Sequence, residues 1–580
     1  MKFTVLALDY DGTIAGDGGV DPQVRTAVAA IRSRGVVVIL VTGRILEDLR
    51  RVAGDLHFVD AVVAENGAVV LFPSSGYVEV LASPPPPSLI EALRHDGVSL
   101  GVGESVVEAD AREAPRILGV IRLLELPLVI LFNRGRLMVL PQAVSKATGL
   151  RHALTVLRLS PHNAVAIGDG ENDHELLRAC EVGIAVGWGS AALREAADYV
   201  VPGDGPAALA PYIDGLADRA RVPSPLKTRR RLRLGHTADG RVFELAARGR
   251  NVLIAGDPRS GKSWVAGLLS EQLILQGYCL CILDPEGDYT SLEVLPGVSV
   301  FGGIDPLPRP RDLLRALRHP DGSVVVDLSH TPQAEKVEYV RNLLPGLATL
   351  RRRTGLPHRI VLDEAHYVLD DPDVGSLVDL ELKGYTLVTY RASHLRPDVL
   401  AATEAIIATR ESDPREVRAL RALCRGCATA EPEEWDRLFG DLVIGEAIVL
   451  PVTDEAQGQA RRIQLSPRIT PHDRHVAKYV DIPVTPGRAF IFTSNGEGAG
   501  PVARTLRELV AGVEQLPLSS IEGHLKRRDF SRWLSEVFGD YPLAATVAQI
   551  EDDHRAGRAG EVAARLSQAV RSRYEFLGVD

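Results

Sequence analysis

The chain repeatedly ends a short apolar run in an aspartate or a glycine. Segments of this form are VLALDYDG, VVVILVTG, AVAIGDG, NVLIAGDP, CLCILDPEGD and RIVLDEAH. The apolar runs alternate with helical stretches, and this alternation is typical of doubly wound parallel sheets. Such sheets bind ligands at the carboxyl ends of their strands. The pattern therefore predicts α/β units with polar sites at strand ends.

Breaks in this pattern divide the chain. Its 580 residues exceed what one hydrophobic core holds. We predict an α/β unit over 1–215 with an inserted cap at about 70–145, a basic linker over 216–236, an α/β unit over 237–465 and a mainly helical unit over 466–580. In the last unit, Leu525, Phe530 and Trp533 recur at helical spacing, so we expect one amphipathic helix over 523–551.

Charge and hydropathy exclude some classes of protein. The net charge of −10 argues against a protein that coats nucleic acid. No apolar run approaches the roughly 20 residues that cross a bilayer. The opening MKFTVLAL stops at Asp9, too early for a signal-peptide core. We therefore expect a cytoplasmic chain without a membrane partner.

Acidic strand ends form the first predicted site. Asp9 and Asp11 are two residues apart, so an extended strand directs both carboxylates to one side. A second acidic pair, Asp169 and Asp173, follows another apolar run. Between the two acidic pairs lie Thr42 and Lys146. Carboxylates together with such a lysine and threonine suit a Mg²⁺ ion that holds a phosphoryl group. The candidate metal ligands are Asp9, Asp11, Asp169 and Asp173.

The ordered motifs DYDGT, VTGR, SKATGL and GDGENDHELL resemble those of the haloacid dehalogenase (HAD) phosphatases, in particular the capped Cof-type branch. The resemblance covers about the first 215 residues and implies a Rossmann-like fold, Mg²⁺ and a small phosphorylated metabolite. It implies that Asp9 attacks phosphorus and that Asp11 is the general acid and base. Thr42 and Lys146 would hold phosphoryl oxygens, and Asn172 would orient these groups.

The segment GDPRSGKS, after the apolar run NVLIA, fits the Walker A pattern. Its glycines let backbone N–H groups wrap phosphates, while Lys262 reaches the β and γ oxygens and Ser263 ligates Mg²⁺. We therefore predict that this unit binds ATP. The predicted nucleotide-binding residues are Gly256, Ser260, Gly261, Lys262, Ser263, Asp363 and Thr389.

The strand end RIVLDEAH supplies the acidic residues that hydrolysis needs. Asp363 would order the magnesium shell, and Glu364 would activate water or, alternatively, cap the following helix. CLCILDPEGDY, SVVVDLS and TLVTYRAS resemble strand ends of HerA/FtsK-type ATPases, with Thr389 at the place of a polar γ-phosphate sensor. Tyr390 stands where a glutamine often follows in that family.

This second resemblance implies a RecA-like fold and a homo-oligomer, by the family pattern a hexamer that moves DNA. A DNA track needs basic residues, for which Arg351–Arg353 and Lys383 are the candidates. Arg391 and Arg410 are either arginine fingers acting on a neighbouring subunit or ordinary surface arginines.

Three functions follow from these motifs. The first is a Mg²⁺-dependent phosphatase whose activity or assembly is regulated by the ATP-binding unit. The second is a nucleic-acid motor or end-processing enzyme with the layout of polynucleotide kinase-phosphatases. The third is a scaffold switched by nucleotide binding.

Overall fold

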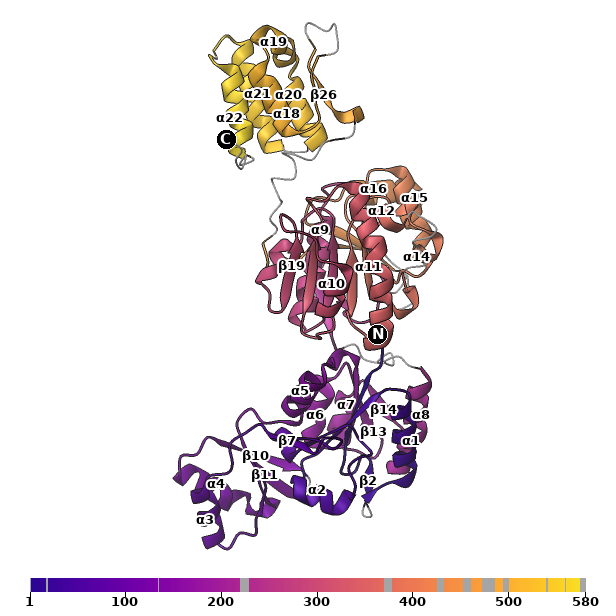
Figure 1. Cartoon of the computed structure of the whole chain (residues 1–580), viewed down its shortest axis with the longest axis vertical. Helices are drawn as coiled ribbons and strands as arrows, with labels where there is room; N and C mark the ends of the chain where they lie inside the picture. Colours follow the sequence, from indigo (N-terminus) through magenta and orange to yellow (C-terminus); the bar gives the residue numbers. More distant parts are fainter. Residues whose placement is uncertain are drawn as a thin grey trace.

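Two sheets account for the strand–helix alternation of the sequence. The computed structural model describes residues 2–16, 19–133, 135–219, 229–369, 378–424, 432–451, 460–471, 484, 486–493, 500–538, 541–558 and 560–573. Figure 1 shows these residues as an N-terminal unit (up to 219), a middle unit (229–471) and a C-terminal unit (from 484), stacked along the long axis.

The N-terminal sheet has the strand order β14-β13-β12-β1-β4-β5-β6-β7. Neighbours from β14 to β5 are parallel, whereas β6 and β7 are antiparallel. Buried aliphatic clusters lie on both faces, as expected for a parallel sheet between helices. The elements are β1 (Val5–Asp9), α1 (Pro22–Ser33), β4 (Val37–Val41), α2 (Leu46–Ala53), β5 (Ala61–Ala64), β6 (Val69–Phe72), β7 (Tyr77–Val80), α5 (Lys146–Leu157), β12 (Ala164–Gly168), α6 (His174–Ala179), β13 (Val182–Val186), α7 (Ala191–Ala196), β14 (Tyr199–Val201) and α8 (Ala210–Arg219).

The cap is a separate antiparallel sheet with two helices. Its strand order is β10-β11-β9-β8, and its core is aliphatic. The cap is shorter than the predicted range 70–145, because β6 pairs with β5, β7 pairs with β6, and both strands extend the main sheet. Its elements are α3 (Pro87–His95), β8 (Gly101–Val102), β9 (Val107–Asp110), α4 (Ala114–Leu123), β10 (Leu128–Asn133) and β11 (Arg136–Pro141).

The middle sheet has the order β16-β15-β25-β24-β23-β17-β22-β21-β18-β20-β19. The strands from β23 to β19 are parallel, and antiparallel strands complete one side. Part of the predicted linker, from Arg231, belongs to this sheet. The elements are β15 (Arg231–Thr237), β16 (Val242–Ala246), β17 (Val252–Ala255), α9 (Lys262–Leu275), β18 (Leu280–Asp284), β19 (Val298–Gly302), α10 (Pro310–Ala316), β20 (Ser323–Asp327), α11 (Gln333–Thr354), β21 (Arg359–Leu362), α12 (His366–Leu369), β22 (Tyr385–Thr389), α14 (Pro397–Ala401), β23 (Ala405–Ala408), α15 (Pro414–Leu423), α16 (Pro432–Gly440), β24 (Glu446–Pro451) and β25 (Arg461–Leu465).

The described part of the C-terminal unit is mainly helical around one apolar core. The helix expected over 523–551 is broken, because Arg528 adopts φ 56°, which ends one helix and starts the next. No helix among the described residues is long and apolar enough to cross a membrane. The elements are β26 (Phe490–Ile491), β27 (Val502–Ala503), α18 (Leu506–Gln515), α19 (Leu518–Arg527), α20 (Asp529–Trp533), η11 (Leu534–Phe538), α21 (Tyr541–Arg555) and α22 (Val562–Arg573).

Candidate functional site

The carboxyl ends of the central strands gather the polar residues of the N-terminal unit. Because β1 lies between β12 and β4, the ends of these strands are neighbours. Asp9 ends β1, Thr42 follows β4 and Asp169 follows β12. The short 3-10 turn after β12 adds Asp173. The strand order therefore brings residues from distant parts of the chain to one edge.

Asp9, Asp169 and Asp173 form one buried carboxylate cluster. One oxygen of each lies within 4.8 Å of the others, and none of the three residues is more than 3% exposed. Burial and the charge of Asp173 raise the pKa of Asp9 well above its ordinary value, although Lys146 opposes this shift. Mg²⁺ prefers carboxylate oxygens, and a divalent cation would offset their mutual repulsion. The cluster therefore fits a Mg²⁺ ion held by these three aspartates.

Lys146 is the cation beside this cluster. Its Nζ donates to Asp9 Oδ1 and to Asp173 Oδ1, both at 2.6 Å. Burial favours a lower pKa for Lys146, but the charges of Asp173 and Asp9 outweigh burial and raise it. Ser145 caps α5 by accepting from the backbone N–H of Thr148. This N-terminal capping of α5 by Ser145 fixes Lys146 in the first helical turn, so that a charged amine faces the carboxylates.

Asp11 lies outside the carboxylate cluster. Its Oδ1 accepts from Arg44 Nη2 at 2.7 Å and from Arg44 Nε at 2.9 Å. Arg44 also donates to Asp48 at 2.7 Å and lies over the ring of Tyr10. The Asp11 side chain is 36% exposed, unlike the buried Asp9. The structure thus does not bring the Asp11 carboxylate to the predicted metal ligands, because Arg44 holds it at the opening of the site.

Hydroxyl and amide groups surround the cluster. Thr13 Oγ1 donates to Asp9 Oδ2 at 2.9 Å and lies 3.3 Å from Asp169 Oδ1. Thr42 is fully buried, and its Oγ1 accepts a backbone N–H. Asn172 Nδ2 is buried without a hydrogen-bond partner. A buried amide N–H without a hydrogen bond costs free energy. This donor beside the carboxylates is therefore suited to a bound oxyanion.

The cap domain contacts the main domain at this site and contributes to the lining of its cavity. A Cβ atom on Gly43 would lie 3.1 Å from Met138 Cε of β11, so the two bodies are in close contact there. A cavity of about 520 Å³ opens beside the cluster, and Asn133 of the cap lines it together with Asp169 and Trp188. This volume suits a small ligand. Sequence reasoning did not identify Arg44, Asn133 or Trp188, because their roles depend on contacts between distant segments.

In the middle unit, a glycine-containing turn joins β17 to α9. Gly256 and Gly261 adopt φ 149° and 104°, which side chains rarely tolerate. Ser260 Oγ lies 2.5 Å from Thr409 Oγ1, which pins the turn to the end of the neighbouring strand β23. A turn of this kind at a helix N-terminus is a favourable site for phosphate.

Acidic residues converge beside this turn. Lys262 begins α9, and its Nζ donates to the Asp257 carbonyl at 2.8 Å. Ser263 Oγ donates to Asp288 Oδ2 at 2.8 Å. Burial lowers the pKa of Lys262, and burial together with Asp288 raises the pKa of Asp363 to about 7. The turn and the strand ends thus supply an amine, a hydroxyl and carboxylates within one region.

The remaining predicted residues follow β21 and β22. Thr389 ends β22, and its Oγ1 lies 3.0 Å from His366 Nδ1. Glu364 adopts φ 47°, and its carboxylate lies 3.5 Å from the same nitrogen. Lys262 Nζ lies 5.9 Å from the centre of the Tyr390 ring. Tyr390, which departs from the family pattern, therefore lies near the lysine predicted to bind phosphate.

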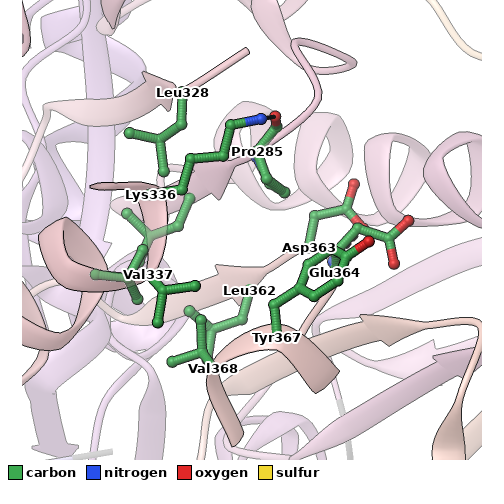
Figure 2. Close-up of a pocket in the computed structure, with 11 residues that line it drawn as sticks. Pro285, Leu328, Lys336, Val337, Leu362, Asp363, Glu364, Tyr367 and Val368 are labelled. Carbon is green, nitrogen blue, oxygen red and sulfur yellow. Dashed lines mark hydrogen bonds between the residues drawn. The ribbon is translucent and has the colours of Figure 1, made fainter. Parts of the chain in front are cut away.

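A small apolar cavity lies behind these carboxylates. Figure 2 shows Lys336 reaching the carbonyl of Pro285, with Asp363 and Glu364 on the far side of the cavity. Lys336 Nζ donates to that carbonyl at 2.6 Å. The cavity volume of about 20 Å³ accommodates roughly one water molecule. It is too small for a ligand, and Lys336 instead fixes the loop after β18.

Two of the basic residues considered for a DNA track, Arg351 and Lys383, make contacts within the middle unit. Arg351 is 3% exposed, and its guanidinium donates to the carbonyls of Pro357 and Lys383. The expectation that Arg351 faces a channel is therefore wrong, because it packs inside the fold. Lys383 Nζ is itself paired with Glu404.

Comparison with known proteins concerns the N-terminal unit. The family of haloacid dehalogenase-like hydrolases matches residues 6–90 and 125–212. A phosphoglycolate phosphatase of Archaeoglobus fulgidus is 34% identical over 208 residues, which are 35% of this chain and 92% of that protein. A phosphoglycolate phosphatase of Natronomonas pharaonis is 31% identical over 230 residues, which are 37% of this chain and 97% of that protein.

A solved structure is also similar to this unit. It is a haloacid dehalogenase-like hydrolase from Bacteroides thetaiotaomicron, with 18% identity, a TM-score of 0.34 and coverage of 37% of this chain and all of that one. The sequence relatives match over nearly their whole length and at 31% and 34% identity. The chain therefore belongs, through its N-terminal unit, to the haloacid dehalogenase-like hydrolase family.

Proposed function

We propose that the N-terminal unit is a Mg²⁺-dependent phosphomonoester hydrolase that acts on small phosphorylated metabolites. The grouping of Asp9, Asp169 and Asp173 around the amine of Lys146 supports this proposal most directly. Because the sequence relatives are phosphoglycolate phosphatases, phosphoglycolate is the first substrate to test.

The first chemical step uses the two aspartates of DYDGT. A carboxylate oxygen of Asp9 attacks phosphorus and forms a P–O bond, while the ester P–O bond breaks. Protonated Asp11 gives its proton to the leaving oxygen, which departs as an alcohol. The exposure of Asp11 at the opening favours this role, since it must reach the leaving group. Arg44 would release Asp11 when substrate enters.

The second step hydrolyses the aspartyl-phosphate on Asp9. Asp11 accepts a proton from water, the water oxygen attacks phosphorus, and the P–O bond to Asp9 breaks. Thr42, Lys146 and the free amide of Asn172 bind the phosphoryl oxygens throughout. Bound Mg²⁺ supplies charge neutralisation for the transferring phosphoryl group.

Phosphate release from a panel of phosphorylated metabolites tests this proposal. We expect Asp9→Asn to abolish turnover, because an amide cannot act as the nucleophile, while Asp55→Asn is the matched control at a 71% exposed side chain. Chelation should remove activity and added Mg²⁺ should restore it. Equal rates for Asp9→Asn and the unchanged protein would refute the assignment.

For the middle unit, we propose a RecA-like P-loop ATPase, whose sheet begins at Arg231 rather than at the predicted boundary of 237. Support comes from the glycine turn before α9 and from the acidic strand ends beside it. Lys262 and Thr389 would contact the γ-phosphate. Ser263 would ligate Mg²⁺ and Asp363 would order its water shell. Glu364 would activate the attacking water.

The test of this proposal is to measure ATP binding and ATP turnover separately. Lys262→Ala should lose both, because it removes the amine that we propose binds the β- and γ-phosphates. Lys526→Ala, at a 61% exposed side chain of α19, is the matched control. Tight ATP binding without any turnover in the unchanged chain would instead favour the nucleotide-switched scaffold.

We further propose that nucleotide regulates or assembles the phosphatase through a homo-oligomer, which the family pattern makes a hexamer. Sedimentation and phosphatase rate are compared with no nucleotide, with ATP and with a non-hydrolysable analogue. Unchanged mass and unchanged rate in all three would remove this coupling. Phosphoryl transfer to a DNA 5′ hydroxyl would instead favour the end-processing alternative.

A further inference from the structure

The N-terminal and middle units meet at the amino ends of their strands. His162 lies in the 3-10 turn before β12, Glu181 directly precedes β13, and His358 directly precedes β21. His162 Nε2 lies 3.0 Å from the Gln276 carbonyl at the end of α9. Its ring stacks on the ring of Tyr278, with centroids 3.7 Å apart. These contacts join the edges opposite to both candidate sites.

A buried carboxylate lies at the centre of this junction. Glu181 is 5% exposed, and its Oε2 accepts from the Tyr278 hydroxyl at 3.0 Å. His162 Nδ1 lies 2.9 Å from the same oxygen, and Arg230 Nε and Arg248 Nε lie within 3.7 and 3.9 Å of the carboxylate. Burial favours a higher pKa for Glu181, but His162 and the two arginines outweigh it and lower the pKa. The carboxylate is thus charged and depends on partners from both units.

Two further contacts extend the junction. His358 is fully buried, with its ring edge-on to those of His162 and Tyr278 at 5.3 and 5.6 Å. Arg230 Nη2 donates to the carbonyls of Arg178, Ala179 and Cys180, which precede Glu181. Arg230 belongs to the basic run predicted as a linker, and it instead binds the N-terminal unit just before its chain enters β15.

We infer that this Glu181 cluster locks the two α/β units into one rigid body in which the amino ends of their strands face each other. Removing one partner of a buried charge leaves that charge uncompensated, so the cluster resists separation strongly. Figure 1 shows the two units end to end. This inference concerns the junction alone and holds whatever ligands the two sites bind.

Because the amino ends of the strands face each other, the carboxyl ends, and with them the two candidate sites, point away from each other. Asp169 follows β12 and Asp363 follows β21. At about 3.3 Å per strand residue, each aspartate lies roughly 15–25 Å from the junction, in opposite directions. The sites are therefore roughly 40 Å apart on opposite ends of one body. A product of one site must leave it and diffuse to reach the other, so the pair does not hand over a bound substrate.

Hydrogen exchange of the full chain in increasing urea tests the lock. Peptides over 164–168 and 280–284 should lose protection at one shared midpoint in the unchanged protein. Tyr278→Phe should lower protection in both peptides by about tenfold or more, because a buried bond to a charged group is lost. Tyr77→Phe is the matched control, at an exposed tyrosine of β7.

Glu181→Gln keeps the volume and removes the charge, so it provides a second variant at the same cluster. We expect it to separate the two midpoints. Separate midpoints in the unchanged protein would overturn the inference. A Tyr278→Phe variant that behaves like Tyr77→Phe would overturn it as well. None of these readouts requires phosphatase or ATPase activity.

Discussion

Replacing Lys146 by methionine tests the balance of charge at the first site. Its Nζ is shared by Asp9 and Asp173, and the side chains of all three are at most 4% exposed. Methionine fills the volume but leaves the carboxylates without their cation. Breaking a buried ion pair in this way costs about 3–5 kcal/mol. The equilibrium constant for opening of the N-terminal unit should therefore increase by roughly two to four orders of magnitude.

The assay is hydrogen exchange of peptides covering β1 and β12, with and without Mg²⁺. A cation that binds the folded cluster stabilises it by mass action, so Mg²⁺ should recover more stability in Lys146→Met than in the unchanged chain. Phosphate release should remain lost in both conditions, because the proposed mechanism also needs this amine to bind the phosphoryl group. Lys526→Met is the control. A loss below about 1 kcal/mol, the usual value for exposed pairs, would refute the reasoning.

Arg44→Ala should lower the phosphatase kcat and alter its pH profile while leaving Mg²⁺ affinity unchanged, since Arg44 holds Asp11, which lies outside the carboxylate cluster; steady-state rates against pH and Mg²⁺ concentration test this. Acid should weaken the junction, because burial lowers the pKa values of His162 and His358 and only their unfolded forms take up protons readily. Stability should therefore fall as pH drops below about 6.5, by up to about 1.4 kcal/mol per pH unit for each histidine, and urea midpoints between pH 5 and 7.5 measure the slope. Ser263→Ala should weaken Mg²⁺-dependent ATP binding more than Mg²⁺-free binding, and titration calorimetry separates the two; equal losses would contradict its metal role.

The strand ends were the predictable part of this protein. Parallel strands put their carboxyl ends on one edge, so Asp9 and Asp169 could be grouped from sequence alone. Arg44 could not be assigned to Asp11, because that pairing depends on how two loops approach. The cap boundary was misplaced since apolar strands such as β6 look alike in a main sheet and in an inserted one. Arg351 was predicted to line a DNA track and Arg230 to lie in a linker, because their carbonyl partners in other segments cannot be read from the sequence.

The pairing of β15 with β25 has a consequence for synthesis. The middle sheet joins Gly235 to Leu465, so it closes only after residue 465 has left the ribosome. The N-terminal unit can fold earlier, and at 5–20 residues per second it waits for roughly ten to fifty seconds. During that interval its docking edge is bare. We expect the Glu181 carboxylate to keep this edge hydrated until Tyr278 and the rest of the middle unit cover it, whereas an apolar edge would invite aggregation.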